Sequence, residues 1–207
     1  MRKLVVTTFM TLDGVMQAPG GPEEDADGAF EHGGWSVGYW DERMGELALE
    51  VHLEAGGVVF GRRSYEILAG YWPKIGDEDP LAAKLNSVPK YVASRSHPTL
   101  DWQNSTLLEG DVAEAVAALK AEEGGPLLVI GSSDLVQTLL RHDLVDTLVI
   151  WTFPAVVGEG KRLFGDGTIP AGFRLDGIET STTGVTVARY GRDGEIKGGT
   201  FGEDSAG

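Results

Sequence analysis

The sequence predicts an α/β domain, and three observations carry that prediction. Short β-branched runs alternate along the chain with longer stretches in which apolar residues recur at helical spacing. The run from Leu127 to Ile130 is continuously apolar, which is typical of a strand buried on both faces of a sheet. Two later runs, Phe173–Glu179 and Val185–Tyr190, flank a turn at Thr183–Gly184 and predict an antiparallel hairpin.

The first part of the chain is predicted to contain one long helix between two strands. Leu4–Phe9 is the first strand and Val58–Phe60 the second. Asp41 is of the residue type that caps helix N-termini, and the glycines at 56 and 57 predict where that helix ends. The apolar residues of one helical face are Met44, Leu47, Ala48, Val51 and Ala55.

Shorter elements follow in the same alternation. A short helix runs through Leu68, and a second begins at Asp79–Pro80, where proline suits the first helical position, and ends near Asn86. Lys90–Ala93 is the third strand. The remaining predicted elements are a helix capped by Asp111, the strand 127–130, a helix carrying Leu135, Val136, Leu139 and Leu140 on one side, and the strand Thr147–Phe153.

Composition and charge narrow the class of function. The 207 residues are 42% hydrophobic and 24% charged, as in an ordinary globular protein. There are 17 basic and 32 acidic residues, and a net charge of −15 repels phosphate backbones and anionic membranes, so we expect no nucleic-acid and no membrane partner. The absence of cysteine excludes disulfides, thiolate nucleophiles and cysteine-ligated metals. The N-terminal residues do not resemble an export signal, so a cytoplasmic location is expected.

Three predicted strands end in a cluster of small or basic residues that opens a helix or a loop. In open α/β sheets, ligands bind beyond the carboxyl ends of the strands. Helix N-termini offer unpaired N–H groups, glycine permits close backbone approach, and serine and arginine donate hydrogen bonds to phosphate oxygens. The clusters are Gly61, Arg62, Arg63 and Ser64; Ser94, Arg95 and Ser96; and Gly131, Ser132 and Ser133. Together they indicate a ligand with several phosphates, although each alone is also typical of helix caps and solvated charges.

Four segments, in this order and spacing, resemble the dihydrofolate-reductase-like proteins. The resemblance is closer still to the branch related to the reductase half of the bifunctional riboflavin-pathway deaminase-reductase. The segments are Phe9–Gly14, Val59–Glu66, Tyr91–Arg95 and Leu144–Phe164, and the resemblance extends from about residue 2 to residue 191. It implies a three-layer αβα sandwich with a mainly parallel central sheet, NADPH as hydride donor, and a homodimer.

The resemblance also implies roles for the three clusters. Residues 61–64 would bind the pyrophosphate and the 2′-phosphate of NADPH, and residues 94–96 would flank its adenosine end. Residues 131–133 fall where the family has a Gly-Gly pair under the pyrophosphate, and Ser132 stands here in place of the second glycine. A dinucleotide with an added 2′-phosphate would use all of these anion sites.

Hydride transfer to many substrates also needs a proton source, and two carboxyl groups are candidates. In dihydrofolate reductases the acid lies on the helix before the Gly-Arg turn, which brings the matching position near Gly45–Glu46. Glu46 is only adjacent to that position, and helical spacing turns it away from the Met44 face. Asp13 lies in the Asp-Gly turn after the first strand, beside the expected nicotinamide site. The alternative roles are a solvated helix charge for Glu46 and a turn residue bonded to its own backbone for Asp13.

The loop from Gln17 to Trp40 is a candidate lid, with a solvated insertion as the alternative. Its aromatic residues, Trp35, Tyr39 and Trp40, would either close over a heteroaromatic substrate or staple the loop to the core. Lys161 is a candidate substrate contact. No metal site is expected, because none of the histidines pairs with another at i+3 or i+4. The histidines are His32, His52, His97 and His142.

For the whole chain we predict one dihydrofolate-reductase-like domain over residues 1–192 and a flexible tail over residues 193–207. The predicted function is an NADPH-dependent reductase that transfers a hydride to a small heterocycle such as a pterin or a pyrimidine. One alternative is a non-catalytic NADP-binding or interaction protein that has kept the fold. Another is a reductase of the phosphoribosylamino-uracil intermediate of riboflavin synthesis, which would depend on a separate deaminase.

Overall fold

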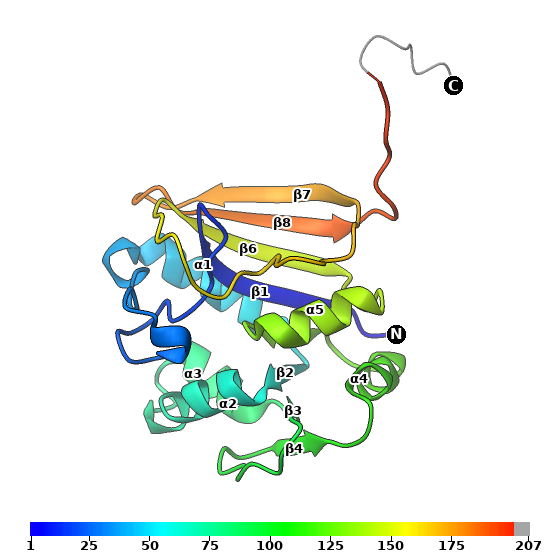
Figure 1. Ribbon diagram of the computed structural model, residues 1–207. Helices are drawn as coiled ribbons and strands as arrows, with labels where there is room; N and C mark the ends of the chain where they lie inside the picture. Colours follow the sequence, from blue (N-terminus) through cyan, green and yellow to red (C-terminus); the bar gives the residue numbers. More distant parts are fainter. Residues whose placement is uncertain (201–207) are drawn as a thin grey trace.

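The computed structural model describes residues 1–200, and within them eight strands form one central sheet (Figure 1). The strand order is β4-β3-β2-β5-β1-β6-β8-β7. The strands are β1 Leu4–Thr11, β2 Gly57–Gly61, β3 Lys90–Ala93, β4 Ser105–Leu108, β5 Leu127–Ile130, β6 Thr147–Phe153, β7 Phe173–Thr180 and β8 Thr186–Arg192. The pairs among β1 to β6 are parallel, whereas β8 runs antiparallel to both β6 and β7. The predicted mainly parallel sheet with a C-terminal antiparallel hairpin is confirmed.

Helices cover both faces of the sheet and make the three layers of an αβα sandwich. The helices are α1 Glu42–Leu53, α2 Arg62–Ala69, α3 Pro80–Ser87, α4 Val112–Ala121 and α5 Ser133–Arg141. On one face α1 packs on Val5 and Leu128, while side chains of α2 and α3 pack beside it on Val58. On the other face α4 and α5 pack on Val6 and Val129. Figure 1 shows α1 and α5 on opposite sides of β1.

Aspartates cap three of the helices, as the sequence predicts, but α1 is shorter than expected. The caps are Asp41 of α1, Asp79 of α3 and Asp111 of α4. The sequence predicts that α1 ends at Gly56, whereas it ends at Leu53. The backbone of Gly56 passes so close to Gly125 that an added Cβ would lie 2.8 Å from the Gly125 Cα. This glycine therefore serves a close crossing of two chain segments before β2, rather than a helix C-cap.

The segment Gln17–Trp40 is packed onto the domain, which contradicts the alternative of a merely solvated insertion. Its Phe30 is buried in a small cluster with Val15 and Ala18. The side-chain amide of Gln17 donates hydrogen bonds to two backbone carbonyls of the same segment, at 2.9 and 2.8 Å. Two short 3₁₀ helices, η1 Asp27–Ala29 and η2 Val37–Tyr39, form its remaining regular structure.

Lys90, the first residue of β3, is a fully buried cation. Its Nζ donates hydrogen bonds to the carbonyls of Asn86, Val88 and Gln103 at 3.2, 2.8 and 3.0 Å, and lies 4.7 Å from the centroid of the Trp102 ring. Burial lowers the pKa of Lys90 to about 8. The ammonium group thereby connects the end of α3 to the segment before β4.

The last described residues, 193–200, form neither helix nor strand and extend away from the sheet (Figure 1). The predicted tail continues into residues 201–207, which lie outside the described residues. Among the helices of residues 1–200, none has the length and the apolar character needed to cross a bilayer.

Candidate functional site

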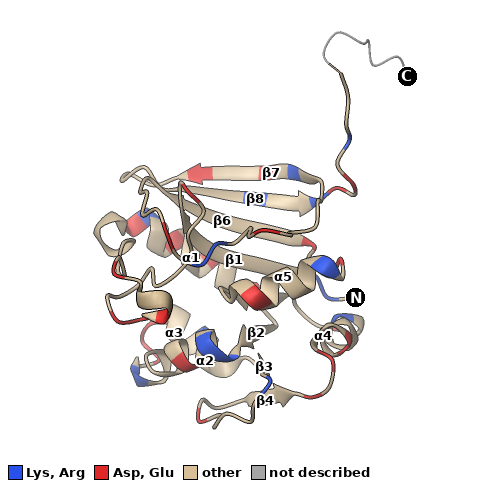
Figure 2. Ribbon diagram, in the orientation of Figure 1, with Lys and Arg blue, Asp and Glu red and all other residues tan. Residues whose placement is uncertain are grey.

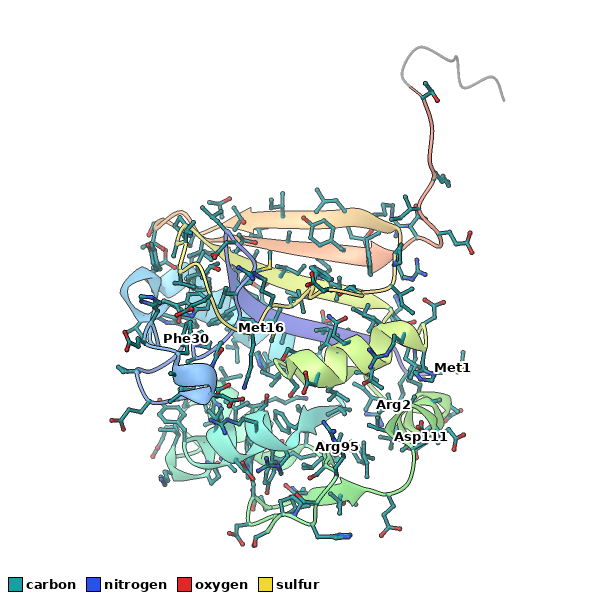
Figure 3. All side chains as sticks on the ribbon, in the orientation of Figure 1. Met1, Arg2, Met16, Phe30, Arg95 and Asp111 are labelled. Carbon is teal, nitrogen blue, oxygen red and sulfur yellow. The ribbon has the colours of Figure 1, made fainter. Side chains whose placement is uncertain are left out.

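A cavity of about 1630 Å³ opens beyond the carboxyl ends of β2, β3 and β5 and continues along β1. Met16, which follows β1, and Arg95, which follows β3, line it from different strand ends and are labelled in Figure 3. All ten residues that the sequence assigns to a cofactor line this one cavity: Gly61, Arg62, Arg63, Ser64, Ser94, Arg95, Ser96, Gly131, Ser132 and Ser133. The fold thus brings three clusters that are distant in sequence into a shared space.

The hydroxyl of Ser132 joins the end of β5 to the end of β2. The backbone N–H of Gly61 donates a hydrogen bond to Ser132 Oγ at 2.9 Å, and Ser132 Oγ donates to Ser64 Oγ at 2.7 Å. Because the Ser64 hydroxyl is the acceptor of that bond, its own hydrogen remains available for an acceptor in the cavity. The direction of these hydrogen bonds therefore leaves Ser64 able to donate to a ligand.

The turn between β5 and α5 has a backbone that favours glycine at two successive positions. Gly131 has φ +64°, and Ser132 has φ +66° and ψ +70°. The left-handed conformation costs a non-glycine residue about 1–2 kcal/mol. Ser132 thus adopts a conformation that suits glycine, and its hydrogen bonds to Gly61 at the end of β2 and to Ser64 in α2 offset the strain.

The arginines of the cavity differ in their partners. Arg62 forms an ion pair with Glu66 one turn along α2, at 2.9 Å, and Arg63 pairs with Asp25 at 2.8 Å. Figure 2 shows basic residues on α2 next to a loop that carries acidic residues. Arg95 lines the cavity, is exposed, and has no carboxylate partner within residues 1–200. Of these arginines, Arg95 is therefore the one that an incoming anion can reach without displacing a carboxylate.

Asp25 holds the loop 17–40 against the cavity. Its side chain is only 10% exposed and forms ion pairs with Arg63 and with Lys161, whose Nζ lies 2.8 Å from Asp25 Oδ2. Lys161 also pairs with Asp27 at 2.9 Å, and its hydrogen bond is the main reason that the pKa of Asp27 falls below its ordinary value. Lys161 lines the cavity, as the sequence suggests, but its charge is already engaged by the loop.

The aromatic residues of the loop divide between the two roles that the sequence left open. Trp35 and Tyr39 pack against Phe153, with ring centroids 5.2 and 6.0 Å apart, and so staple the loop to the core. Trp40 lines the cavity and lies 6.2 Å from the ring of Phe9, centroid to centroid. Only Trp40 of the three therefore remains a candidate for contact with a ring substrate.

Several titratable residues of the cavity were not among the candidates from the sequence, and burial shifts the pKa of two of them, His52 and Glu24. His52 lines the cavity from α1, one turn after Ala48, and burial lowers its pKa. Glu24 lines it from the loop, and burial raises its pKa. The helical spacing of Ala48 and His52 was a usable signal, since it places both on one face of α1. The orientation of Glu24 depends on the path of an irregular loop, which has no sequence period.

Neither carboxyl group proposed from the sequence lines the cavity. Asp13 accepts hydrogen bonds from the Thr11 hydroxyl and from the backbone of Gly158, at 2.8 Å for the latter, and the Thr11 bond is the main cause of its lowered pKa. Glu46 is exposed and pairs with Arg43 at 2.8 Å. An ionised turn carboxylate and a solvated helix charge are poorly suited to deliver a proton into a cavity that they do not reach, so the structure does not support these two assignments.

Comparison with known proteins gives relatives over nearly the whole chain. The uncharacterized proteins YyaP and YwjB of Bacillus subtilis (strain 168) are 27% and 26% identical to it. The match to YyaP covers 91% of this chain and 94% of the relative, and the match to YwjB covers 86% and 91%.

Solved structures share the fold. A putative riboflavin biosynthesis protein from Shewanella sp. PV-4 has a TM-score of 0.70 at 23% identity, over 92% of this chain and 99% of that one. A pyrimidine reductase-like protein from Corynebacterium diphtheriae has a TM-score of 0.61 at 13% identity, over 93% and 92%. The model of the RibD C-terminal domain matches residues 2–187. The chain therefore belongs to the RibD C-terminal domain family, as its dihydrofolate-reductase-like fold and its sequence motifs predict.

Proposed function

We propose that this protein is an NADPH-dependent reductase of a small ring compound. The single observation that carries the proposal is that three strand-end clusters of glycine, serine and arginine line one cavity. Proteins of this family typically use NAD(P)H. The cavity volume of about 1630 Å³ exceeds the roughly 300–1,000 Å³ that is usual for one small ligand, so it has room for a dinucleotide and a substrate together.

The residues of the cavity fit such a cofactor. The N-termini of α2 and α5 both open at this edge of the sheet, where unpaired N–H groups and the helix dipoles favour phosphate. Ser64 has a hydroxyl hydrogen available for a phosphate oxygen, because its oxygen accepts from Ser132. Arg95 supplies a planar guanidinium at the β3 end, and the proposal assigns it to the 2′-phosphate, which the resemblance places at residues 61–64.

In this proposal the protein binds and orients, and the cofactor supplies the hydride. The dinucleotide lies across the ends of β3, β2 and β5, which leaves the part of the cavity next to β1, α1 and the loop for the substrate. Glu24 lines that part, and burial raises its pKa, so its carboxyl group is the proposed proton source. The loop residues from Gln17 to Asp25 form the wall that excludes water from the reacting rings.

The test compares Arg95→Ala with Arg62→Ala, using NADPH and NADH as a matched pair of ligands. Because Arg62 is already paired with Glu66, we expect Arg95→Ala to cause the larger loss. Its affinity for NADPH should fall roughly 10–150-fold, and its affinity for NADH should change little, since a charged hydrogen bond is worth about 1.5–3 kcal/mol. Equal losses for both cofactors would refute the assignment of Arg95 to a 2′-phosphate.

A second candidate function is a non-catalytic nucleotide-binding protein. The observation in its favour is that Asp13 and Glu46 do not line the cavity. Absorbance of the reduced nicotinamide at 340 nm, followed with pterins, flavins and pyrimidines, separates the two candidates. Steady oxidation of NADPH with any of these compounds excludes the non-catalytic function.

A further inference from the structure

His52 lines the cavity, and its ring carries a hydrogen-bond acceptor. Its Nδ1 lies 2.6 Å from the carbonyl oxygen of Ala48, and because a carbonyl only accepts, Nδ1 must carry the hydrogen. Burial lowers the pKa of His52, so the ring is neutral at pH 7 and Nε2 keeps its lone pair. Within residues 1–200 Nε2 has no hydrogen-bond partner, and the ring lines the cavity.

The surroundings of His52 suit a flat ring. Phe9 and Trp151 line the same cavity from β1 and β6, with their ring centroids 5.4 Å apart. Leu68 and Leu85 line it from α2 and α3. A lining of aromatic and aliphatic side chains favours a planar substrate, and one polar atom in that lining would fix its orientation.

The charges on this side of the cavity disfavour a phosphate. The cations of the cavity that contact the loop 17–40 are Arg63, which is paired with Asp25, and Lys161, which is paired with Asp25 and Asp27. Glu23 and Glu24 also line the cavity here and add further carboxyl groups. A phosphorylated substrate would have to displace a carboxylate from a cation, whereas a neutral or cationic substrate would not.

We infer that the substrate is an unphosphorylated planar ring compound bearing N–H or O–H donors, and that His52 Nε2 accepts one of those hydrogen bonds. This inference rests on the proposed function, because it assigns a substrate class to the part of the cavity that the dinucleotide leaves open. This substrate class differs from the phosphorylated riboflavin intermediate, which is the substrate of one alternative given by the resemblance. His52 acts here as a recognition residue and not as the proton source.

Equilibrium dialysis with pterin and pterin-6-carboxylate tests the charge preference, since the two rings share their donors and differ by one negative charge. The fluorescence of the pterins reports binding, with and without saturating NADP⁺. We expect pterin to bind at least about 10-fold more tightly than the carboxylate. Tighter binding of the carboxylate, or binding of neither ring, would overturn the inference.

Two substitutions at His52 test the acceptor. His52→Gln retains an acceptor oxygen, and His52→Phe retains a flat side chain without one. We expect His52→Phe to bind pterin roughly 5–15-fold more weakly and His52→Gln to remain within about 3-fold of the unmodified protein. Unchanged NADP⁺ affinity shows that the cavity is still folded. Equal pterin affinity in all three proteins would contradict the role of His52.

Asp27→Asn tests whether carboxylates exclude anions, with Glu31→Gln as the matched control. Asp27 pairs with Lys161 and lines the cavity, whereas Glu31 is an exposed acid of the same loop that does not. We expect Asp27→Asn to reduce the preference for pterin over its carboxylate roughly 2–5-fold, and Glu31→Gln to leave it unchanged. Equal effects would refute the charge argument. Failure of NADP⁺ to bind would instead contradict the proposed function, while the pterin measurements without NADP⁺ still decide this inference.

Discussion

Replacing Ser132 separates the strain of its backbone from the value of its hydroxyl. Ser132→Ala keeps the left-handed φ of +66° and removes both hydrogen bonds, one from the Gly61 N–H and one to Ser64 Oγ. An N–H left without a partner costs about 1–3 kcal/mol, and the hydroxyl pair is worth about 0.5–1.5 kcal/mol. We therefore expect the free energy of unfolding to fall by about 1.5–4.5 kcal/mol.

Ser132→Gly loses the same two hydrogen bonds but relieves the left-handed strain. The relief is about 1–2 kcal/mol, part of which is offset by the greater entropy of glycine in the unfolded chain. We expect the glycine variant to be about 1 kcal/mol more stable than the alanine variant, although both are less stable than the unmodified protein. In the double variant Ser64→Ala/Ser132→Ala, the two effects should fall short of additivity by about 0.5–1.5 kcal/mol.

The assay is urea unfolding followed by tryptophan fluorescence, with linear extrapolation of the free energy to zero urea. Ser133→Ala is the control, because Ser133 is the neighbouring residue and its hydroxyl has no hydrogen-bond partner within residues 1–200. Its stability should stay within about 0.5 kcal/mol of the unmodified protein. An alanine variant as stable as the unmodified protein, or a glycine variant less stable than the alanine variant, would refute this account of the β5–α5 turn.

Three further predictions concern buried or paired charges. The pKa of Lys90 is about 8 in the folded protein and 10.5 in the unfolded chain, so the unfolded chain binds more protons between these pH values. The free energy of unfolding should therefore rise with pH in this window, by up to about 3 kcal/mol. Urea unfolding of Lys90→Met at several pH values should not show this rise, and the same pH dependence in both proteins would contradict the prediction. The pKa of Asp13 is lowered in the folded protein, so its contribution to stability is present above its unfolded pKa and is lost as the pH falls through the folded value. In acid unfolding followed by circular dichroism, stability should therefore depend less on pH in Asp13→Asn than in the unmodified protein. NADPH oxidation should persist in this variant. Asp25→Asn should loosen the loop by weakening its ion pairs to Arg63 and Lys161, and faster limited proteolysis within residues 17–40 is the expected readout, with an unchanged cleavage rate as the contrary result.

Most of the fold could be predicted because its elements have strong local patterns. Thr147–Phe153 is found with the predicted bounds, and Asp41 and Asp111 cap helices as expected. The strand Ser105–Leu108 could not be predicted, because it has four residues of mixed polarity at the edge of the sheet. Its pairing with β3 depends on a tertiary contact rather than on a sequence period.

The candidate site could be predicted in part for a similar reason. Strand-end clusters such as residues 61–64 are local signals, and the parallel sheet brings their strand ends to one edge. Pairing partners are not local: no sequence pattern indicates that Arg63 meets Asp25, which precedes it by 38 positions and belongs to an irregular loop. The same holds for Asp13, whose turn is held by the backbone of Gly158, 145 positions away.

The contacts of Asp25 have a consequence for how ligands and loop affect one another. An anion that binds Arg63 must displace Asp25, and this largely buried carboxylate then keeps Lys161 as its ion-pair partner. Occupancy of Arg63 by an anion and docking of the loop therefore oppose each other through a shared coupling free energy. Such coupling is reciprocal. The factor by which undocking of the loop strengthens anion binding at Arg63 equals the factor by which a bound anion shifts the loop toward its undocked state.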